Sequence, residues 1–134
     1  MMAAEALRRA VRAALSTVGA GVADAGPIAG TFPRIELPGG SESDWGHKSG
    51  EGAEVRMAVI VRDKGERPDR MMRGLGEAQA ALDAIALERG AAEGDAVAGW
   101  QLVSWRRGAS RSAREGSGWA GVIEYRARML RQEG

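Results

Sequence analysis

The chain has 134 residues, a formal net charge of +1, no cysteine and an aromatic content of 4%. This length fits a single domain with a modest core. The lack of cysteine excludes disulfides and thiolate metal sites, and the balanced charge gives no reason to expect a polyanionic partner.

The first predicted element is an amphipathic helix in the Ala- and Arg-rich start of the chain. Leu7, Val11, Leu15 and Val18 recur at helical spacing, and a glycine-rich stretch follows. We interpret this segment as a helix of the folded domain and not as a targeting segment. A short strand is predicted next at residues 34–37, which lie between two prolines.

The best-defined strand is predicted at residues 54–63. Apolar side chains occupy every second position there, which is the pattern of a half-buried strand. The inward-facing residues are Val55, Met57, Val59 and Val61. The preceding residues, 38–53, are predicted to form a loop, because they are rich in glycine and charged residues.

A second amphipathic helix is predicted to begin near Pro68. Apolar residues then repeat at spacings of four and three up to Ile85, and Gly90 stands where a helix cap is expected. Gly74 and Gly76 interrupt this pattern. They either allow a close approach to the sheet or a neighbouring subunit, or they are tolerated defects of roughly 1 kcal/mol each relative to alanine.

The last third of the chain is predicted to be a hairpin of strands at 97–107 and 118–130, with a flexible polar tip at 108–117 and a bulge at Gly121. One face of the second strand carries Trp119, Ile123, Tyr125, Ala127 and Met129. The order of elements predicts an α+β fold: a four-stranded, mainly antiparallel sheet with both helices packed on one face. No apolar run approaches the roughly 18 residues of a membrane span, so no membrane partner is expected.

The loop 38–53 does not have the pattern of a nucleotide site. A phosphate-binding loop has its lysine directly after a glycine, whereas here His47 separates Gly46 from Lys48. His47 is the only histidine, and in a glycine-rich loop we expect it to be solvated. The sequence therefore predicts no catalytic residue, no cofactor and no metal site, and the protein is not expected to be an enzyme.

Four arginines beside Trp105 form a basic cluster. They are Arg106, Arg107, Arg111 and Arg114, in a final segment (99–134) with seven basic and three acidic residues. We interpret the cluster as a solvated hairpin tip. It also has the composition of a nucleic-acid contact or of a loop that becomes ordered against a protein partner.

Trp45 is unusual because it stands in a polar loop. A large apolar ring in such a place either covers its own domain or docks on a neighbouring molecule. The sequence leaves these two interpretations open.

Residues 44–52 read Asp-Trp-Gly-His-Lys-Ser-Gly-Glu-Gly, and an alternating strand and an amphipathic helix follow them. With this loop of the form D-W-x-x-K-[ST]-G-x-G, the segment from Pro33 to about Leu87 resembles the tail terminator (tail completion) family of minor tail proteins in tailed phages and gene transfer agents. The last third matches that family only in outline, so no function is carried over to residues 108–117.

The resemblance implies a single tail-terminator-like domain over residues 1–134 and a non-enzymatic role. Members of the family form a hexameric ring that caps the tail tube, fixes its length and joins it to the head connector. The implied partners are therefore other copies of the chain, the tail tube protein and the head–tail connector, with DNA passing through the ring without sequence-specific binding. The implied location is the head-proximal end of the virion tail, after assembly in the host cytoplasm. Asp44, Trp45, Lys48 and Glu51 are the implied subunit or tube contacts.

Two other functions stay open at this stage. A head–tail connector or neck adaptor has a similar size and ring symmetry. A small nucleic-acid-binding module would use the Arg106–Arg114 cluster.

Overall fold

The computed structural model describes residues 1–19, 21–23, 32–46, 50–91 and 99–131, and shows two helices and one six-stranded sheet. The elements are α1 (Ala3–Leu15), β1 (Gly21–Ala23), β2 (Arg34–Glu36), β3 (Ser41–Asp44), β4 (Gly52–Lys64), α2 (Asp69–Ala91), β5 (Trp100–Glu115) and β6 (Gly118–Arg131). The α+β class and the mainly antiparallel sheet are as predicted.

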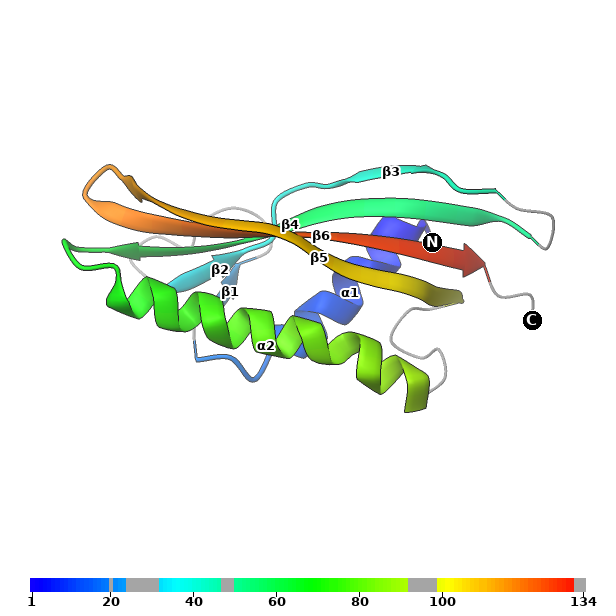
Figure 1. Ribbon diagram of the computed structural model, residues 1–134, viewed down its shortest axis with the longest axis horizontal. Coiled ribbons are helices and arrows are strands. Elements are labelled where there is room, and N and C mark those ends of the chain that lie inside the picture. Colours follow the sequence, from blue (N-terminus) through cyan, green and yellow to red (C-terminus); the bar gives the residue numbers. More distant parts are fainter. Residues whose placement is uncertain (20, 24–31, 47–49, 92–98, 132–134) are drawn as a thin grey trace.

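The sheet is built around the long antiparallel pair of β4 and β6, which are in register from Gly52↔Leu130 to Lys64↔Gly118. Along the sheet the strands are ordered β1-β2-β4-β6-β5. On its other edge β4 pairs with β2 through one half and with β3 through the other. Among the strands of the described residues, β1 and β2 are the one parallel pair. Figure 1 shows that β4, β5 and β6 extend along the whole length of the molecule.

The number of strands differs from the predicted four. Strand β3 lies within the predicted loop 38–53, and β1 follows the first helix. The sequence of β3, Ser-Glu-Ser-Asp, has no apolar alternation because the strand lies at the edge of the sheet and only its second residue is partly covered. Strand β1 is three residues long, which is too short for a periodic pattern.

The prediction of a flexible polar tip at residues 108–117 is also wrong. Strand β5 continues to Glu115, and only Gly116 and Ser117 connect it to β6. Gly116 has φ of 58°, a left-handed conformation that suits a tight hairpin turn. The end of β5 is exposed on both faces, so its sequence shows no alternation.

Both helices pack against the same face of the sheet, as predicted (Figure 1). A single core joins the apolar stripe of α1, that of α2 and the inward-facing residues of β4 and β6. Its fully buried side chains include Leu7, Val11, Leu15, Met71, Leu82, Val59, Val61, Ile123 and Met129. The other face of the sheet, which we call the open face, carries neither of the two helices in the described residues. No helix in the described part of the chain is long and apolar enough to cross a membrane.

Two glycines allow α2 to lie close to the sheet. A Cβ atom at Gly121 would stand 2.7 Å from Met71 Sδ, and one at Gly74 would stand 3.1 Å from Val61 Cγ1. The close approach that we considered for Gly74 is thus confirmed, whereas Gly76 has open space around its missing Cβ. No bulge occurs at Gly121; the irregularities of the hairpin lie on β5, at 102–104 and 107–110.

Candidate functional site

The structure brings three of the four predicted loop contacts to one end of the sheet. Asp44 ends β3 opposite Ala53, and the backbone N–H of Trp45 donates a hydrogen bond to the carbonyl of Gly52 at 3.0 Å. Glu51 follows after the turn and forms an ion pair with Arg131 at 3.1 Å. Lys48 and His47 lie outside the described residues.

The ring of Trp45 is partly buried and covers its own domain. The guanidinium carbon of Arg128 lies 5.4 Å from the ring centroid, and Arg128 Nε also donates a hydrogen bond to Glu54 at 3.2 Å. These contacts hold the ring beside the end of β6, with part of its surface still accessible. The structure therefore supports the first of the two interpretations of Trp45 and leaves an accessible aromatic surface next to the exposed Asp44.

Glu42 links this end of the sheet to the first helix. This residue was not predicted from the sequence as part of a site. Its carboxylate accepts a hydrogen bond of 2.7 Å from the backbone N–H of Ala4, in the first turn of α1. A carboxylate at a helix N-terminus is favourable because the free N–H groups there carry a partial positive charge. The small cavity beside it, about 300 Å³, is lined by Met2, Glu42, Asp44, Glu51, Trp100 and Arg131, among others.

The predicted arginine cluster is divided between the two faces of β5. Arg107 forms an ion pair with Asp83 of α2 at 3.0 Å, and Arg114 donates a hydrogen bond of 3.1 Å to the carbonyl of Glu66. These two arginines lie on the helix side. Arg106 and Arg111 lie on the open face, where Arg111 pairs with Glu124 at 3.2 Å. The four residues therefore do not form one basic tip.

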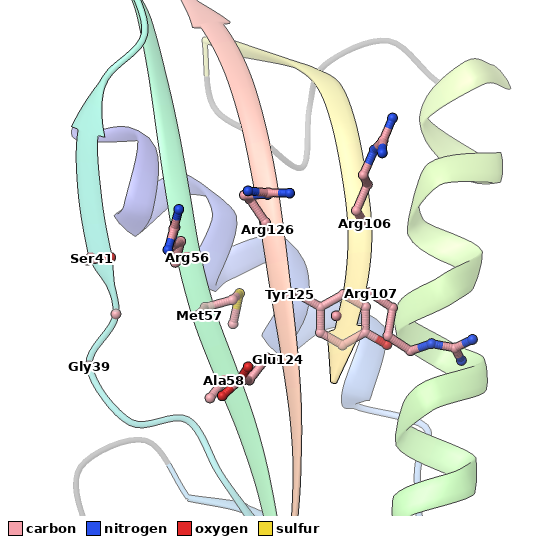
Figure 2. A pocket seen from close by; sticks show the side chains of 12 residues that line it. Gly39, Ser41, Arg56, Met57, Ala58, Arg106, Arg107, Glu124, Tyr125 and Arg126 are labelled. Carbon is pink, nitrogen blue, oxygen red and sulfur yellow. The ribbon is translucent and has the colours of Figure 1, made fainter. Parts of the chain in front are cut away.

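Arg106 instead belongs to a row of arginines that crosses three strands. In the sheet register Arg56 of β4 faces Arg126 of β6, and Arg126 faces Arg106 of β5. We call these three residues the arginine row. Figure 2 shows the three side chains beside one another on adjacent strands. The row lines a groove of about 680 Å³ on the open face, whose edge is formed by Gly39, Gly40 and Ser41.

Arg56 and Arg126 were not predicted from the sequence as members of a site. Both stand at outward-facing positions of predicted strands, so their face was predictable. Their alignment with Arg106 depends on the register of β5, which has one extra residue between Arg107 and Ser110. Such a bulge gave no signal in the sequence beyond the presence of Gly108.

An aromatic pair behind the row fixes the hairpin to α2. The rings of Trp105 and Tyr125 stack at 4.5 Å, Trp105 Nε1 donates to the carbonyl of Leu82 at 2.8 Å, and the Tyr125 hydroxyl donates to Asp83 at 3.1 Å. Burial, together with the charge and hydrogen bond of Asp83, raises the pKa of Tyr125. The hydroxyl thus stays protonated as a donor, and the pair joins β5 and β6, which carry Arg106 and Arg126, to α2.

Asp63 is the only buried polar or charged residue in the described part of the chain. Arg70 donates two hydrogen bonds to its carboxylate, at 2.6 and 2.9 Å, and these lower the pKa of Asp63. The pair joins the end of β4 to the start of α2 and is structural. Within the same described residues, no group of three or more His, Cys, Asp or Glu side chains is placed to hold a metal ion.

Comparison with known proteins finds similarity among solved structures. No family model matches the chain, and no curated protein matches it in sequence. A chain in the solved structure "Virion of native gene transfer agent (GTA) particle" aligns with a TM-score of 0.50 and 23% sequence identity. The alignment covers 94% of this chain and 90% of that one. The two chains share a fold. At this identity the likeness establishes the fold alone.

Proposed function

We propose that the chain is a non-enzymatic structural protein of a virion or gene transfer particle, and specifically a tail terminator. The observation that carries this proposal is the likeness to a chain of a gene transfer agent virion over nearly the full length of both chains. The resemblance of residues 44–52 to the terminator loop supports the narrower assignment. In this role the protein forms a hexameric ring, caps the tail tube, fixes its length and joins it to the head connector.

The proposal assigns the chain a place and a set of partners. It acts in the virion, at the head-proximal end of the tail, after assembly in the host cytoplasm. Its partners are other copies of the chain, the tail tube protein and the head–tail connector, and DNA passes through the ring. None of these partnerships needs a cofactor.

A closed ring of identical subunits requires two different, complementary surfaces on each chain. We assign one of them to the end of the sheet that carries Asp44, Trp45 and Glu51, together with Lys48 of the same loop. An accessible aromatic ring flanked by charged side chains is a suitable anchor for such a contact. The long, exposed strand β5 at the edge of the sheet is a suitable second surface, because its free backbone groups can pair with a neighbouring strand.

The test is to delete the gene in its host and to image the particles by negative-stain electron microscopy, with a complemented strain as control. Tails of uncontrolled length, or finished tails separated from filled heads, are the expected result. Normal particles in the deletion strain would contradict the proposal. Tails of normal length beside heads that lack connector density would instead identify a neck adaptor.

A further inference from the structure

The arginine row is unfavourable for folding by itself. Residues directly opposite each other on antiparallel strands have Cβ atoms about 5 Å apart, and like charges in such pairs destabilise a sheet. Arg126 stands between two such neighbours, Arg56 and Arg106. Among the described residues, no carboxylate forms an ion pair with Arg106 or Arg126.

The carboxylates near the row on the open face are already engaged. Glu54 forms ion pairs with Arg128 at 3.2 Å and with Arg56 at 3.5 Å, and Glu124 pairs with Arg111. The part of the open face around the groove thus has five arginines and two glutamates, a local surplus of three positive charges. The five arginines are Arg56, Arg106, Arg111, Arg126 and Arg128. This local charge is hidden in the chain's overall +1.

We infer that the open face binds the sugar-phosphate backbone of double-stranded DNA through the arginine row. Guanidinium groups match phosphate oxygens with two parallel hydrogen bonds, and arginine stays charged at every physiological pH. Three strands spaced about 4.8 Å apart give a row about 10 Å long. Duplex DNA carries one phosphate per strand in each 3.4 Å of its axis, and each of the three guanidinium groups can contact one phosphate.

The chemistry of the groove favours duplex DNA over a single strand. Single-strand sites combine positive charge with aromatic rings on which the bases stack. Here the ring of Tyr125 is stacked on Trp105 and bonded to α2 through its hydroxyl, so it faces the helix side. The residues that line the groove therefore offer guanidinium groups without a stacking surface, and the accessible ring of Trp45 lies outside the groove, against Arg128. Because these groups contact phosphates and not base edges, the binding is independent of DNA sequence.

The same groove is less suited to an acidic protein segment. Protein interfaces have an apolar, often aromatic, centre surrounded by polar residues. The centre of this groove is Arg126, and the outward-facing apolar side chain next to the row is the small Ala58. The groove can therefore bind a partner mainly through its positive charge, and this suits a polyanion.

The test is fluorescence anisotropy of a labelled 20-base-pair duplex titrated with the purified full-length protein at low salt. We expect binding that weakens with salt, with a slope of log K against log[salt] near −3, since about 0.9 counterions are released per phosphate contact. The same affinity is expected for duplexes of unrelated sequence. Absence of binding at the lowest salt concentration would overturn the inference.

Two variants of the row and one control variant locate the binding surface. Arg126→Glu is expected to weaken binding at least ten-fold, whereas Arg9→Ala, on the exposed side of α1, leaves the affinity unchanged. Arg106→Ala is expected to weaken binding several-fold and to reduce the salt slope by about one. Equal losses in Arg126→Glu and Arg9→Ala, or no loss in either, would overturn the assignment of the surface.

A labelled polyglutamate peptide separates DNA from an acidic protein partner. If the peptide binds more tightly than the duplex, the inference is wrong and the face recognises an acidic protein. Circular dichroism and thermal unfolding confirm that each variant is folded. The experiment uses no tails or heads, so its outcome is independent of the deletion phenotype that tests the proposed function.

Discussion

Gly121 of β6 lies so close beneath Leu75 of α2 that a Cβ atom at position 121 would stand 2.8 Å from Leu75 Cδ2. The same atom would stand 2.7 Å from Met71 Sδ, so two core side chains would have to move. The absence of a side chain at this position sets the distance between α2 and the sheet. A residue that looked like a bulge in the sequence is therefore a packing position.

The first prediction follows from this contact. Gly121→Ala is expected to lower the free energy of unfolding by about 1–3 kcal/mol, because overpacking forces core side chains out of their preferred rotamers. Gly76→Ala is the control, since Gly76 lies in α2, the helix that Gly121 contacts, and has open space around its missing Cβ. It is expected to raise stability by about 0.5–1 kcal/mol. Urea unfolding of both variants measures the difference, and a stable Gly121→Ala protein would contradict the packing argument.

The second prediction concerns the buried carboxylate of Asp63. The hydrogen bonds from Arg70 hold its folded-state pKa below the usual value of about 3.9, so the ion pair stabilises the fold above that pH. This contribution is lost as the pH falls through the lower, folded-state pKa. Asp63→Asn is expected to cost about 1–3 kcal/mol at pH 7 and to make stability fall less steeply between pH 4 and pH 2.

Urea unfolding at several pH values checks this prediction. Glu77→Gln, which removes an exposed carboxylate from α2, is the control and is expected to follow the parent protein at each pH. Parallel curves for Asp63→Asn and the parent would show that Asp63 does not contribute to acid unfolding.

The elements that face the core were predictable from the sequence. In β4 and α2, alternation and helical spacing identified the buried residues, because each element has one apolar face and one polar face. Strand β3 and the end of β5 were missed for the opposite reason, since edge strands exposed on both faces carry no such pattern. A strand can therefore be predicted from apolar alternation only where one of its faces is buried.

The arginine row shows a second limit. If β5 had no bulge, the register from the turn would place Arg107, and not Arg106, opposite Arg126. One extra residue between Arg107 and Ser110 exchanges the faces of these two arginines. Arg107 is thereby free to pair with Asp83 of α2. A one-residue change in register moves every side chain to the other face, which is why the composition of this segment could not locate its charges.

The third prediction concerns the aromatic pair behind the row. Trp105→Phe retains a ring to stack on Tyr125 but loses the hydrogen bond to the carbonyl of Leu82. We expect a loss of about 1 kcal/mol in the free energy of unfolding. Trp105→Ala removes the stacking as well and is expected to cost at least about 1 kcal/mol more. Equal losses in the two variants would show that the stacking contributes nothing.

The fourth prediction tests the assembly surface around Trp45. Trp45→Ala is expected to leave a folded protein that fails to restore normal tails in the deletion strain. Met72→Ala removes a side chain from an exposed position of α2, where the residue is 48% exposed, and is expected to complement fully. Negative-stain counts of tail lengths compare the two. Full complementation by Trp45→Ala would remove this residue from the interface.

The fifth prediction concerns the stability of the arginine row. Arg126→Glu places a carboxylate between Arg56 and Arg106, so two like-charge pairs become two opposite-charge pairs, each worth about 0.2–1 kcal/mol. Part of this gain is offset at Glu54. The hydrogen bond from Arg128 and the nearby charge of Arg126 both lower the pKa of Glu54. The Arg126→Glu substitution would remove the favourable charge of Arg126. We expect a net increase in stability of about 0.5–1 kcal/mol.

The dependence on salt distinguishes this explanation from a packing effect. Added salt screens repulsion between exposed charges, so the parent protein is expected to gain stability between about 10 mM and 300 mM salt. Arg126→Glu is expected to gain less or to lose stability over the same range. A variant that is more stable and yet fails to bind DNA would show that the row is retained for recognition at the expense of the fold. A less stable variant would mean that the three guanidinium groups do not repel one another in the folded protein.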